Sequence, residues 1–333
     1  MPNEPLTNTA TREVRVDVHL SAGAAGSLAQ DVREGLGRRP KRLSPKYFYD
    51  ERGSRLFEEI TRLPEYYPTR AEQRILEGAA GDVVDAIQPD EVVELGPGSA
   101  QKTHTLLDPL LSAGKDTTYV PVDVSESAVR ESAARLAGTY ERLNVHGVVG
   151  DFEEDLPPLR HNGKRRLIAF LGGTIGNFDR SERRAFLQRV RSFLGPGDGL
   201  LVGTDLVKDR TRLEAAYNDS AGVTAEFNRN VLHVINSNLD GDLQPERFQH
   251  VAFYDERAER IEMRLRALEA HTAQIRALEM DVDFELGEEI CTEISCKFTR
   301  EKLTREYAVA GLDLLTWLTD EEGLFALSLM GPA

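Results

Sequence analysis

Cysteine is scarce in this 333-residue chain, where only Cys291 and Cys296 occur. Residues around them alternate as in a strand, and an odd separation places the two side chains on opposite faces, where they cannot easily form a disulfide. Two free thiols are usual in a reducing compartment. The sequence therefore predicts a cytoplasmic protein without disulfides.

Long apolar runs and an excess of positive charge are missing as well. No apolar run approaches the roughly 20 residues that cross a bilayer, and the start of the chain lacks the apolar core of a signal peptide, so no membrane contact is expected. Lysine and arginine number 41 against 56 acidic residues, a formal net charge of −15. Because nucleic acids are bound through basic side chains, no nucleic-acid partner is expected.

Metal-ligand spacing is absent too, since the seven histidines follow no such pattern, and no metal is expected. What remains is an ordinary globular composition, 40% hydrophobic, that can form one large core or two smaller ones. A small molecule is the expected ligand, and the protein is predicted to be a monomer.

Strands alternate with helices from Glu91 onward. Amphipathic helices are expected at 125–136 and at 181–194, the second beginning at Ser181. Alternating strands and helices indicate an α/β fold with a parallel sheet and right-handed crossovers. The strands of this sheet are expected at residues 92–95, 119–123, 145–149, 167–171 and 200–205.

The pattern changes after residue 205. Two helices are followed by segments of alternating polarity, which are typical of antiparallel strands with one buried face. A strand, a helix and a last strand then return to the first pattern. These later elements are expected at residues 213–217, 225–235, 261–267, 272–278, 290–298, 300–310 and 325–329.

This change predicts a second α+β lobe inserted into the α/β core. The lobe is assigned residues 1–66 and 207–290, with 1–25 frayed and order beginning near residue 29, and the core is assigned 67–206 and 291–333. Clefts between such lobes, over the carboxyl edge of the sheet, bind substrates.

The stretch 94–104 is the most informative part of the core, because a buried strand runs into Gly96 and Gly98 and then into a helix. Glycines allow a tight turn and the close approach of a ligand. The third glycine of a dinucleotide site is missing, and Glu94 precedes the corner, so a cationic ligand such as S-adenosylmethionine fits better than a pyrophosphate. A turn that only connects strand and helix is the alternative.

Acidic residues end the next two strands. Asp123 has the position from which an acid binds both ribose hydroxyls in such folds, although it could instead cap the following helix. Asp151 is placed to accept from an adenine amino group and Phe152 to stack on its ring, and a plain turn explains both equally well.

Polar residues at three further places point to a second ligand. Asn177 follows three glycines and could hold an amine or a carboxylate, or be a turn residue. Alternation places Glu293 and Ser295 on one face of their strand, either as a polar recognition pair or as an exposed edge. Several tyrosines, including Tyr49, Tyr66 and Tyr217, could surround an amine, although core packing is the usual role of aromatics.

Taken together, residues 29–329 resemble the histidine Nα-methyltransferases of the ergothioneine pathway, which use S-adenosylmethionine to convert histidine into hercynine. The resemblance rests on nine stretches that together are highly specific. They are PKYFYD (45–50), TRLPEYYPTR (61–70), ELG (94–96), GDFEE (150–154), TIGN (174–177), GTDLVKD (203–209), FNRN (227–230), IEM (261–263) and TEISCKF (292–298).

The resemblance implies a Rossmann-like class I methyltransferase core with an antiparallel C-terminal strand. It also implies a site with two halves and two catalytic residues, Tyr49 near the amine and Asn177 at the amino-acid head group. The implied donor-binding residues are Gly96, Lys102, Asp123, Asp151 and Phe152. The implied histidine-binding residues are Tyr66, Asn177, Tyr217, Met263, Glu293 and Ser295.

The expected activity is three successive methylations of the histidine α-amino group, the first step of ergothioneine biosynthesis. Two other functions stay open. The chain could methylate another amino acid or small amine, or it could be a regulatory module that binds the donor without turnover.

Overall fold

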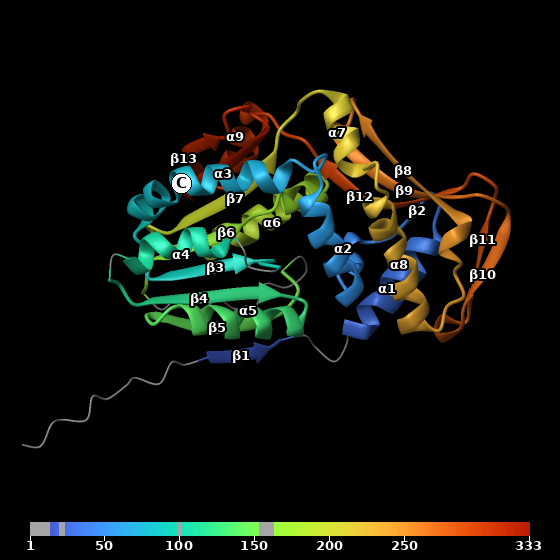
Figure 1. Cartoon of the computed structure of the whole chain (residues 1–333), viewed down its shortest axis with the longest axis horizontal. Helices are drawn as coiled ribbons and strands as arrows, with labels where there is room; N and C mark the ends of the chain where they lie inside the picture. Colours follow the sequence, from blue (N-terminus) through green and yellow to red (C-terminus); the bar gives the residue numbers. More distant parts are fainter. Residues whose placement is uncertain (1–13, 20–23, 99–101, 113, 153–162) are drawn as a thin grey trace, which may run out of the picture.

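The computed structural model describes residues 14–19, 24–98, 102–112, 114–152 and 163–333. In these residues the chain forms two parts that lie side by side (Figure 1). One part is built on an eight-stranded sheet, and the other combines a four-stranded sheet with several helices and a hairpin. We call them the large-sheet part and the small-sheet part.

The large sheet has the strand order β1-β5-β4-β3-β6-β7-β14-β13. Its first six strands are parallel, and β14 pairs antiparallel with both β7 and β13. A parallel sheet that ends in an antiparallel hairpin confirms the predicted α/β methyltransferase fold. The strands are β1 (Val14–Val18), β3 (Glu91–Leu95), β4 (Thr117–Asp123), β5 (Leu143–Val149), β6 (Arg166–Phe170), β7 (Gly199–Asp205), β13 (Leu312–Thr319) and β14 (Phe325–Pro332).

Helices cover both faces of this sheet. Val92 packs with α3, α4 and α5, whereas its neighbour Val93 packs with α6 and α9, because successive strand side chains point to opposite faces. All five residues of β3 are buried, as a central strand between two helical layers requires. The helices are α3 (Pro68–Ile87), α4 (Thr103–Ser112), α5 (Glu126–Thr139), α6 (Arg180–Ser192) and α9 (Arg300–Val309).

The small sheet has the order β2-β12-β9-β8, and β10 and β11 form a separate hairpin. Helix α8 packs on β8 and β9 and also contacts α2. The strands are β2 (Lys41–Arg42), β8 (Phe248–Asp255), β9 (Arg260–Ala267), β10 (His271–Ile275), β11 (Met280–Phe284) and β12 (Glu289–Cys296). The helices are α1 (Ala24–Gly37), α2 (Glu51–Arg62), α7 (Arg210–Tyr217) and α8 (Val223–Leu239).

Several elements depart from the expectations. Strand β1 pairs with β5 at the edge of the large sheet, although residues 1–66 are assigned to the second lobe and order is expected only near residue 29. Strand β12 belongs to the small sheet and crosses the expected boundary at residue 290. A five-residue edge strand and the choice of a partner strand depend on long-range pairing, which periodicity does not reveal.

Local details differ for a similar reason. Helix α6 begins at Arg180, because Asp179 and Glu182 form a capping box and Ser181 is not the cap. The segment 272–278 pairs with β11 through its first four residues and then turns into a short 3-10 helix. None of the described helices combines the length and the apolar composition that a membrane crossing requires.

Candidate active site

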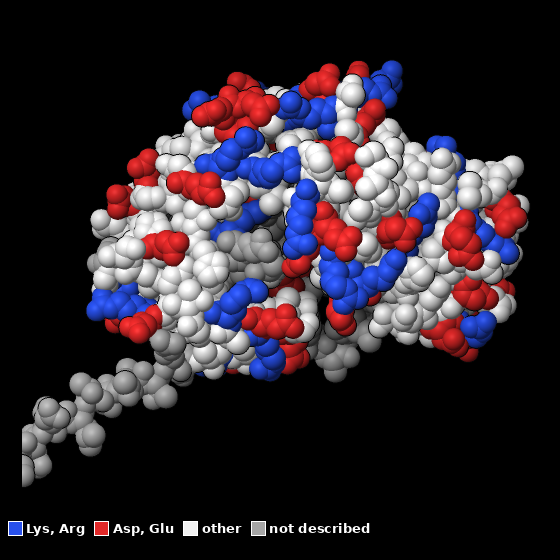
Figure 2. Space-filling view, viewed as in Figure 1, with Lys and Arg blue, Asp and Glu red and all other residues white. Residues whose placement is uncertain are grey.

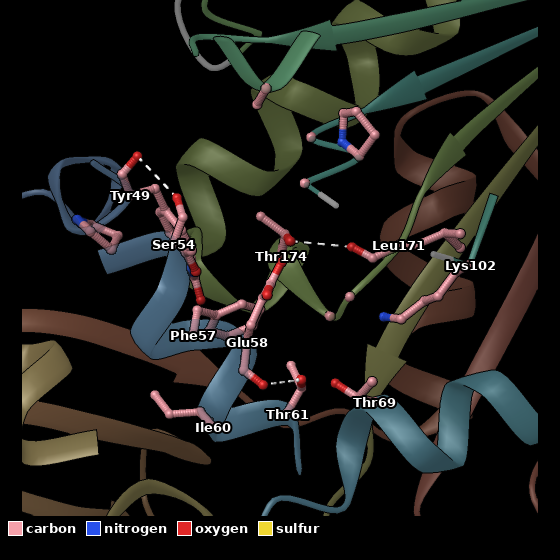
Figure 3. Close-up of a pocket in the computed structure, with 18 of the residues that line it drawn as sticks. Tyr49, Ser54, Phe57, Glu58, Ile60, Thr61, Thr69, Lys102, Leu171 and Thr174 are labelled. Carbon is pink, nitrogen blue, oxygen red and sulfur yellow. Dashed lines mark hydrogen bonds between the residues drawn. The ribbon is translucent and has the colours of Figure 1, made fainter. Parts of the chain in front are cut away.

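A cavity of about 890 Å³ lies between the two parts of the molecule. The space-filling view shows the hollow, with lysine and arginine side chains near its rim (Figure 2). In the close-up, Tyr49 and Phe57 lie on one side, Leu171 and Lys102 lie on the other, and Thr174 lies between them (Figure 3). The cavity is large enough for two small molecules at once.

The carboxyl ends of β3 and β4 form one wall. Gly96 has φ 65°, a left-handed conformation that favours glycine, and it lies beside the Phe152 ring. Asp123 ends β4 and accepts a hydrogen bond of 2.9 Å from the Ser125 amide. Burial raises the pKa of Asp123, while hydrogen bonds from backbone amides oppose the rise. Ser125 itself caps α5, which leaves Asp123 facing the cavity.

Glu94, the acid before the corner, is buried beneath the same wall. Its Oε2 atom accepts hydrogen bonds from the hydroxyls of Thr103 at 2.6 Å and Tyr119 at 2.7 Å. Burial raises its pKa, although both hydroxyls lower it. Glu94 therefore joins β3, α4 and β4 as well as lining the cavity.

An ion pair with the buried Glu72 holds Lys102 in the cavity wall near Gly172. Glu72 of α3 is fully buried, and its carboxylate accepts from the Lys102 ammonium and from the Gly172 amide, the latter at 2.8 Å. The pair thus links α3 with the loops that follow β3 and β6. Lys102 remains in the cavity wall, where its charge suits a carboxylate.

Asp151 and Phe152, which follow the end of β5, also line the cavity. Phe152 packs edge-to-face on Phe170 with ring centroids 5.5 Å apart. Asp151 lies 3.6 Å from the Lys46 ammonium, which also lies 3.1 Å from Asp31. Lys46 therefore connects the small-sheet part to this end of the large sheet. Ser99, Ala100 and Gln101 of the glycine corner, and Glu153 and Glu154 after Phe152, lie outside the described residues.

The opposite wall is aromatic. Tyr49 contacts Phe57 and Phe227 edge-on, each with centroids 5.6 Å apart, and Tyr66 lies 6.4 Å from Tyr217. Although 39% of Tyr49 is exposed, enclosure among these groups and the nearby Glu293 raises its pKa. The tyrosines thus remain neutral phenols at physiological pH.

Strand β12 supplies the polar floor of the cavity. Glu293 and Ser295 both line it and lie opposite Met263 and Ile261 of β9, whereas Ile294 pairs with Glu262 and is buried on the other face of the strand. Burial raises the pKa of Glu293 to about 7, although Lys297 lowers it. The carboxyl is therefore close to its titration point at neutral pH.

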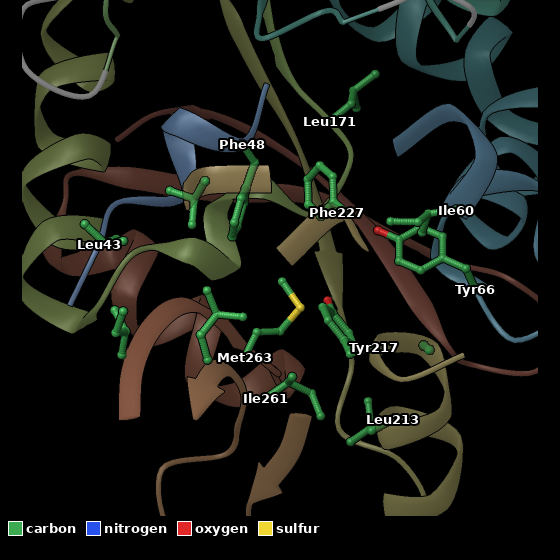
Figure 4. Close-up of a cluster of buried hydrophobic side chains, with 14 of the residues drawn as sticks. Leu43, Phe48, Ile60, Tyr66, Leu171, Leu213, Tyr217, Phe227, Ile261 and Met263 are labelled. Atoms are coloured by element: carbon green, nitrogen blue, oxygen red, sulfur yellow. The ribbon is translucent and has the colours of Figure 1, made fainter. Parts of the chain in front are cut away.

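A bulge in β12 places Glu293 opposite Met263. The register with β9 shifts between Cys291 and Glu293, and the extra residue is Thr292. The Thr292 hydroxyl donates to Asn228 at 2.6 Å and also contacts the Met263 carbonyl at 3.0 Å. The end of the Met263 side chain lies near Phe227 and Tyr217 (Figure 4).

Asn177 reaches the floor from the large-sheet part. It ends the short helix η2 (Thr174–Asn177), which packs against β12. A side chain at Gly176 would approach the Cys296 carbonyl to 3.0 Å, so glycine permits this contact. The same packing brings Asn177 to the histidine-binding half predicted from the sequence.

Comparison with known proteins identifies the family. The family described as histidine-specific methyltransferase, SAM-dependent, matches residues 28–332. The chain belongs to this family. The histidine N-alpha-methyltransferase of Mycobacterium tuberculosis is 48% identical over 95% of this chain and 98% of its own length. The enzyme of the same name from Mycolicibacterium smegmatis is 49% identical over 92% and 95%.

A fungal relative also matches. Ergothioneine biosynthesis protein 1 of Neurospora crassa is 33% identical over 87% of this chain, which corresponds to 33% of that longer protein. The fold and the family together establish an S-adenosylmethionine-dependent N-methyltransferase.

All the site residues that the sequence predicts for this methyltransferase lie in the wall of the cavity described above. The role of each residue stays a prediction. These residues are Tyr49, Tyr66, Gly96, Lys102, Asp123, Asp151, Phe152, Asn177, Tyr217, Met263, Glu293 and Ser295. No group of three or more histidine, cysteine or acidic side chains suited to a metal ion occurs in the described part of the chain.

Sequence reasoning missed some buried groups that hold the methyltransferase site together. Glu72 and Lys297 are buried charges inside amphipathic elements, and nothing in the local pattern separates them from surface residues. Phe57 and Phe227 look like ordinary core aromatics. The density of charged residues in the GTDLVKD and TEISCKF stretches is the one signal in the sequence that could have revealed Lys297 and its partner Asp205.

Proposed function

We propose that this methyltransferase adds three methyl groups to the α-amino nitrogen of L-histidine and forms hercynine, the first step of ergothioneine biosynthesis. The observation that carries the proposal is the meeting of two different halves in one cavity. Glycine, acid and lysine groups at the sheet edge suit the methyl donor, and a carboxyl and a hydroxyl on β12 suit an imidazole.

The donor site fits S-adenosylmethionine by its chemistry. Asp123 offers an acceptor for ribose hydroxyls, Phe152 offers an aromatic face, and Lys102 offers a charge for the donor's carboxylate. Gly96 leaves room for the ligand because it has no side chain, and its positive φ favours glycine at this corner. When bound, S-adenosylmethionine supplies an electrophilic methyl group on a sulfonium.

The protein chiefly supplies alignment of the amine with that methyl group and exclusion of water. The α-amino group of a free amino acid is protonated at neutral pH, so one proton must leave before the nitrogen can attack the methyl group. The raised pKa of Tyr49 disfavours a phenolate base, so its hydroxyl is better suited to orient the amine while water takes the proton. Aromatic faces nearby can stabilise the methylated cation.

Each methylation leaves a larger group in the same place. The dimethylated amine still carries one proton that it can lose, so the third transfer needs no new catalytic group. The wall formed by Tyr49, Phe57 and Phe227 is apolar enough to accept the added methyl groups.

The two parts of the molecule are proposed to divide this work. The core predicted at residues 67–206 and 291–333 would hold the donor, and the lobe predicted at 1–66 and 207–290, joined by β12 of the small sheet, would hold most of the histidine. Free Cys291 and Cys296 support a cytoplasmic location. The net charge of −15 favours a monomer, because like-charged copies repel each other.

The test is direct. The purified protein is incubated with S-adenosylmethionine and L-histidine, and mass spectrometry follows the mono-, di- and trimethylated products. We expect all three in sequence. Absence of every product, from protein that binds the donor, would overturn the function, and a panel of other amino acids would then reveal a different acceptor.

A further inference from the structure

Lys297 lies directly behind the polar floor and is fully buried. Its ammonium is 2.8 Å from the Ser295 hydroxyl, 3.0 Å from the Tyr217 hydroxyl and 2.8 Å from Oδ2 of Asp205. An ammonium has three hydrogens and accepts none. These three contacts therefore use all of its hydrogens.

Asp205 keeps this lysine charged. Its carboxylate also accepts from the Tyr67 hydroxyl, at 2.8 and 2.9 Å, and pairs with Lys208. Burial alone would raise the pKa of Asp205, but Lys297 and Lys208 lower it. Burial likewise opposes a charged Lys297, and Asp205 and Tyr217 more than compensate by raising its pKa.

The lysine dictates where the two hydroxyl hydrogens point. The oxygens of Tyr217 and Ser295 are 2.8 Å apart and both accept from Lys297. One hydroxyl donates to the other, and neither can donate to the ammonium. The remaining hydrogen has no acceptor among the described residues, and both side chains line the cavity.

We infer that Lys297 is a positioning residue that makes the Tyr217–Ser295 pair a hydrogen-bond donor, and so selects substrates whose ring carries an unprotonated nitrogen. Glu293 lies on the same face of β12, and its ionised form can accept a hydrogen bond from a ring N–H group. Donor and acceptor together match a neutral five-membered ring with one N–H group and one bare nitrogen. This inference rests on the proposed function and explains how its site would recognise imidazole.

The inference is tested with ring analogues of histidine. A pyrrole analogue keeps the N–H group but has C–H in place of the bare nitrogen, and both of its isomers are used. A thiazole analogue keeps a bare nitrogen and has sulfur in place of N–H. Dissociation constants are measured by calorimetry in the presence of S-adenosylhomocysteine, and kcat and KM are measured with the donor.

The wild-type protein should bind histidine roughly 100-fold or more tightly than either pyrrole isomer, because the fixed hydroxyl hydrogen would lose its acceptor. In Lys297→Met neither hydroxyl oxygen accepts from an ammonium, so the free hydroxyl hydrogen is no longer held toward the cavity and this ratio should fall at least tenfold. Discrimination against the thiazole, which depends on Glu293, should remain. Nearly equal wild-type binding of histidine and pyrrole would overturn the inference.

Lys208→Met is the matched control, because Lys208 pairs with the same Asp205 but touches neither Tyr217 nor Ser295. This variant should leave the preference for histidine over pyrrole and over thiazole unchanged. If it lost the pyrrole preference as Lys297→Met does, Lys297 would have only a structural role. A Lys297→Met protein that binds S-adenosylhomocysteine normally and keeps the full pyrrole ratio would also overturn the inference.

Tyr217→Phe tests the role of Lys297 if the Lys297→Met protein does not fold. Lys297 would still occupy the Ser295 oxygen, so the serine hydrogen would still face the ligand and the pyrrole ratio should persist. Collapse of the ratio would show that the tyrosine, and not the lysine, sets the direction. Failure of the wild-type protein to bind histidine at all would instead refute the proposed function.

Discussion

Glu293 is a half-buried carboxyl in the cavity wall that lowers the stability of the protein at high pH. Its pKa is raised from an ordinary 4.5 to about 7, because burial penalises the charged form. Between these two pH values the native protein keeps a proton that the unfolded chain has lost. Stability is therefore fully present below pH 4.5 and falls as pH rises through 7.

Glu293→Gln should remove this loss. We expect the variant to be more stable than the wild type at pH 8, by about 3 kcal/mol, with the difference shrinking toward pH 4.5. Chemical denaturation at several pH values, without ligands, measures it. A difference that does not change with pH would show that the carboxyl titrates normally.

Helix α3 and strand β7 pack so closely that the backbone of β7 at Gly203 touches the carboxylate of Glu72 on α3. A side chain built at Gly203 would lie 2.1 Å from Oε1 of Glu72, the carboxylate that holds Lys102 and the Gly172 amide. That carboxylate is buried and cannot move aside without breaking these contacts. The contact between the two elements therefore supports the donor site.

Gly203→Ala should destabilise the protein by about 1–3 kcal/mol and weaken donor binding, because overpacking displaces Glu72. Gly78→Ala is the matched control within α3, since open space surrounds that glycine. It should stabilise the helix by about 0.5–1 kcal/mol and leave the donor affinity unchanged. Thermal denaturation and calorimetry with S-adenosylhomocysteine measure both effects, and normal donor affinity in Gly203→Ala would refute the link.

At the scale of the molecule, the cavity joins two parts that each contribute half of a site. A ligand that binds only the folded state stabilises it in proportion to the logarithm of its concentration over its dissociation constant. Donor product and histidine should each raise the melting temperature by a few degrees, because each binds one wall.

Mutations should remove separately the increases in melting temperature that the two ligands cause. Asp123→Ala should remove most of the S-adenosylhomocysteine increment, and Glu293→Ala most of the histidine increment, because each change removes a polar partner from one ligand only. Thermal shift with each ligand alone is the measurement. Loss of both increments in either variant would indicate general disruption of the cavity.

The sequence by itself determined the alternation of the large-sheet part, the glycine corner and the family. These are local signals, since a buried strand, a positive-φ glycine and a helix start depend on neighbouring residues. The structure assembles Gly96, Asp123, Asn177 and Glu293 at one cavity because the carboxyl ends of parallel strands share an edge.

Only the tertiary structure decided the partners of the buried charges and of the edge strands. β1 joins the large sheet and β12 the small sheet because pairing is chosen by residues far away in sequence. The partners of Lys297, the residue after β12, are likewise Asp205 of β7 and Tyr217 of α7, which it meets only in the folded chain. A hydrogen-bond direction is a property of that assembly, and no local pattern specifies it.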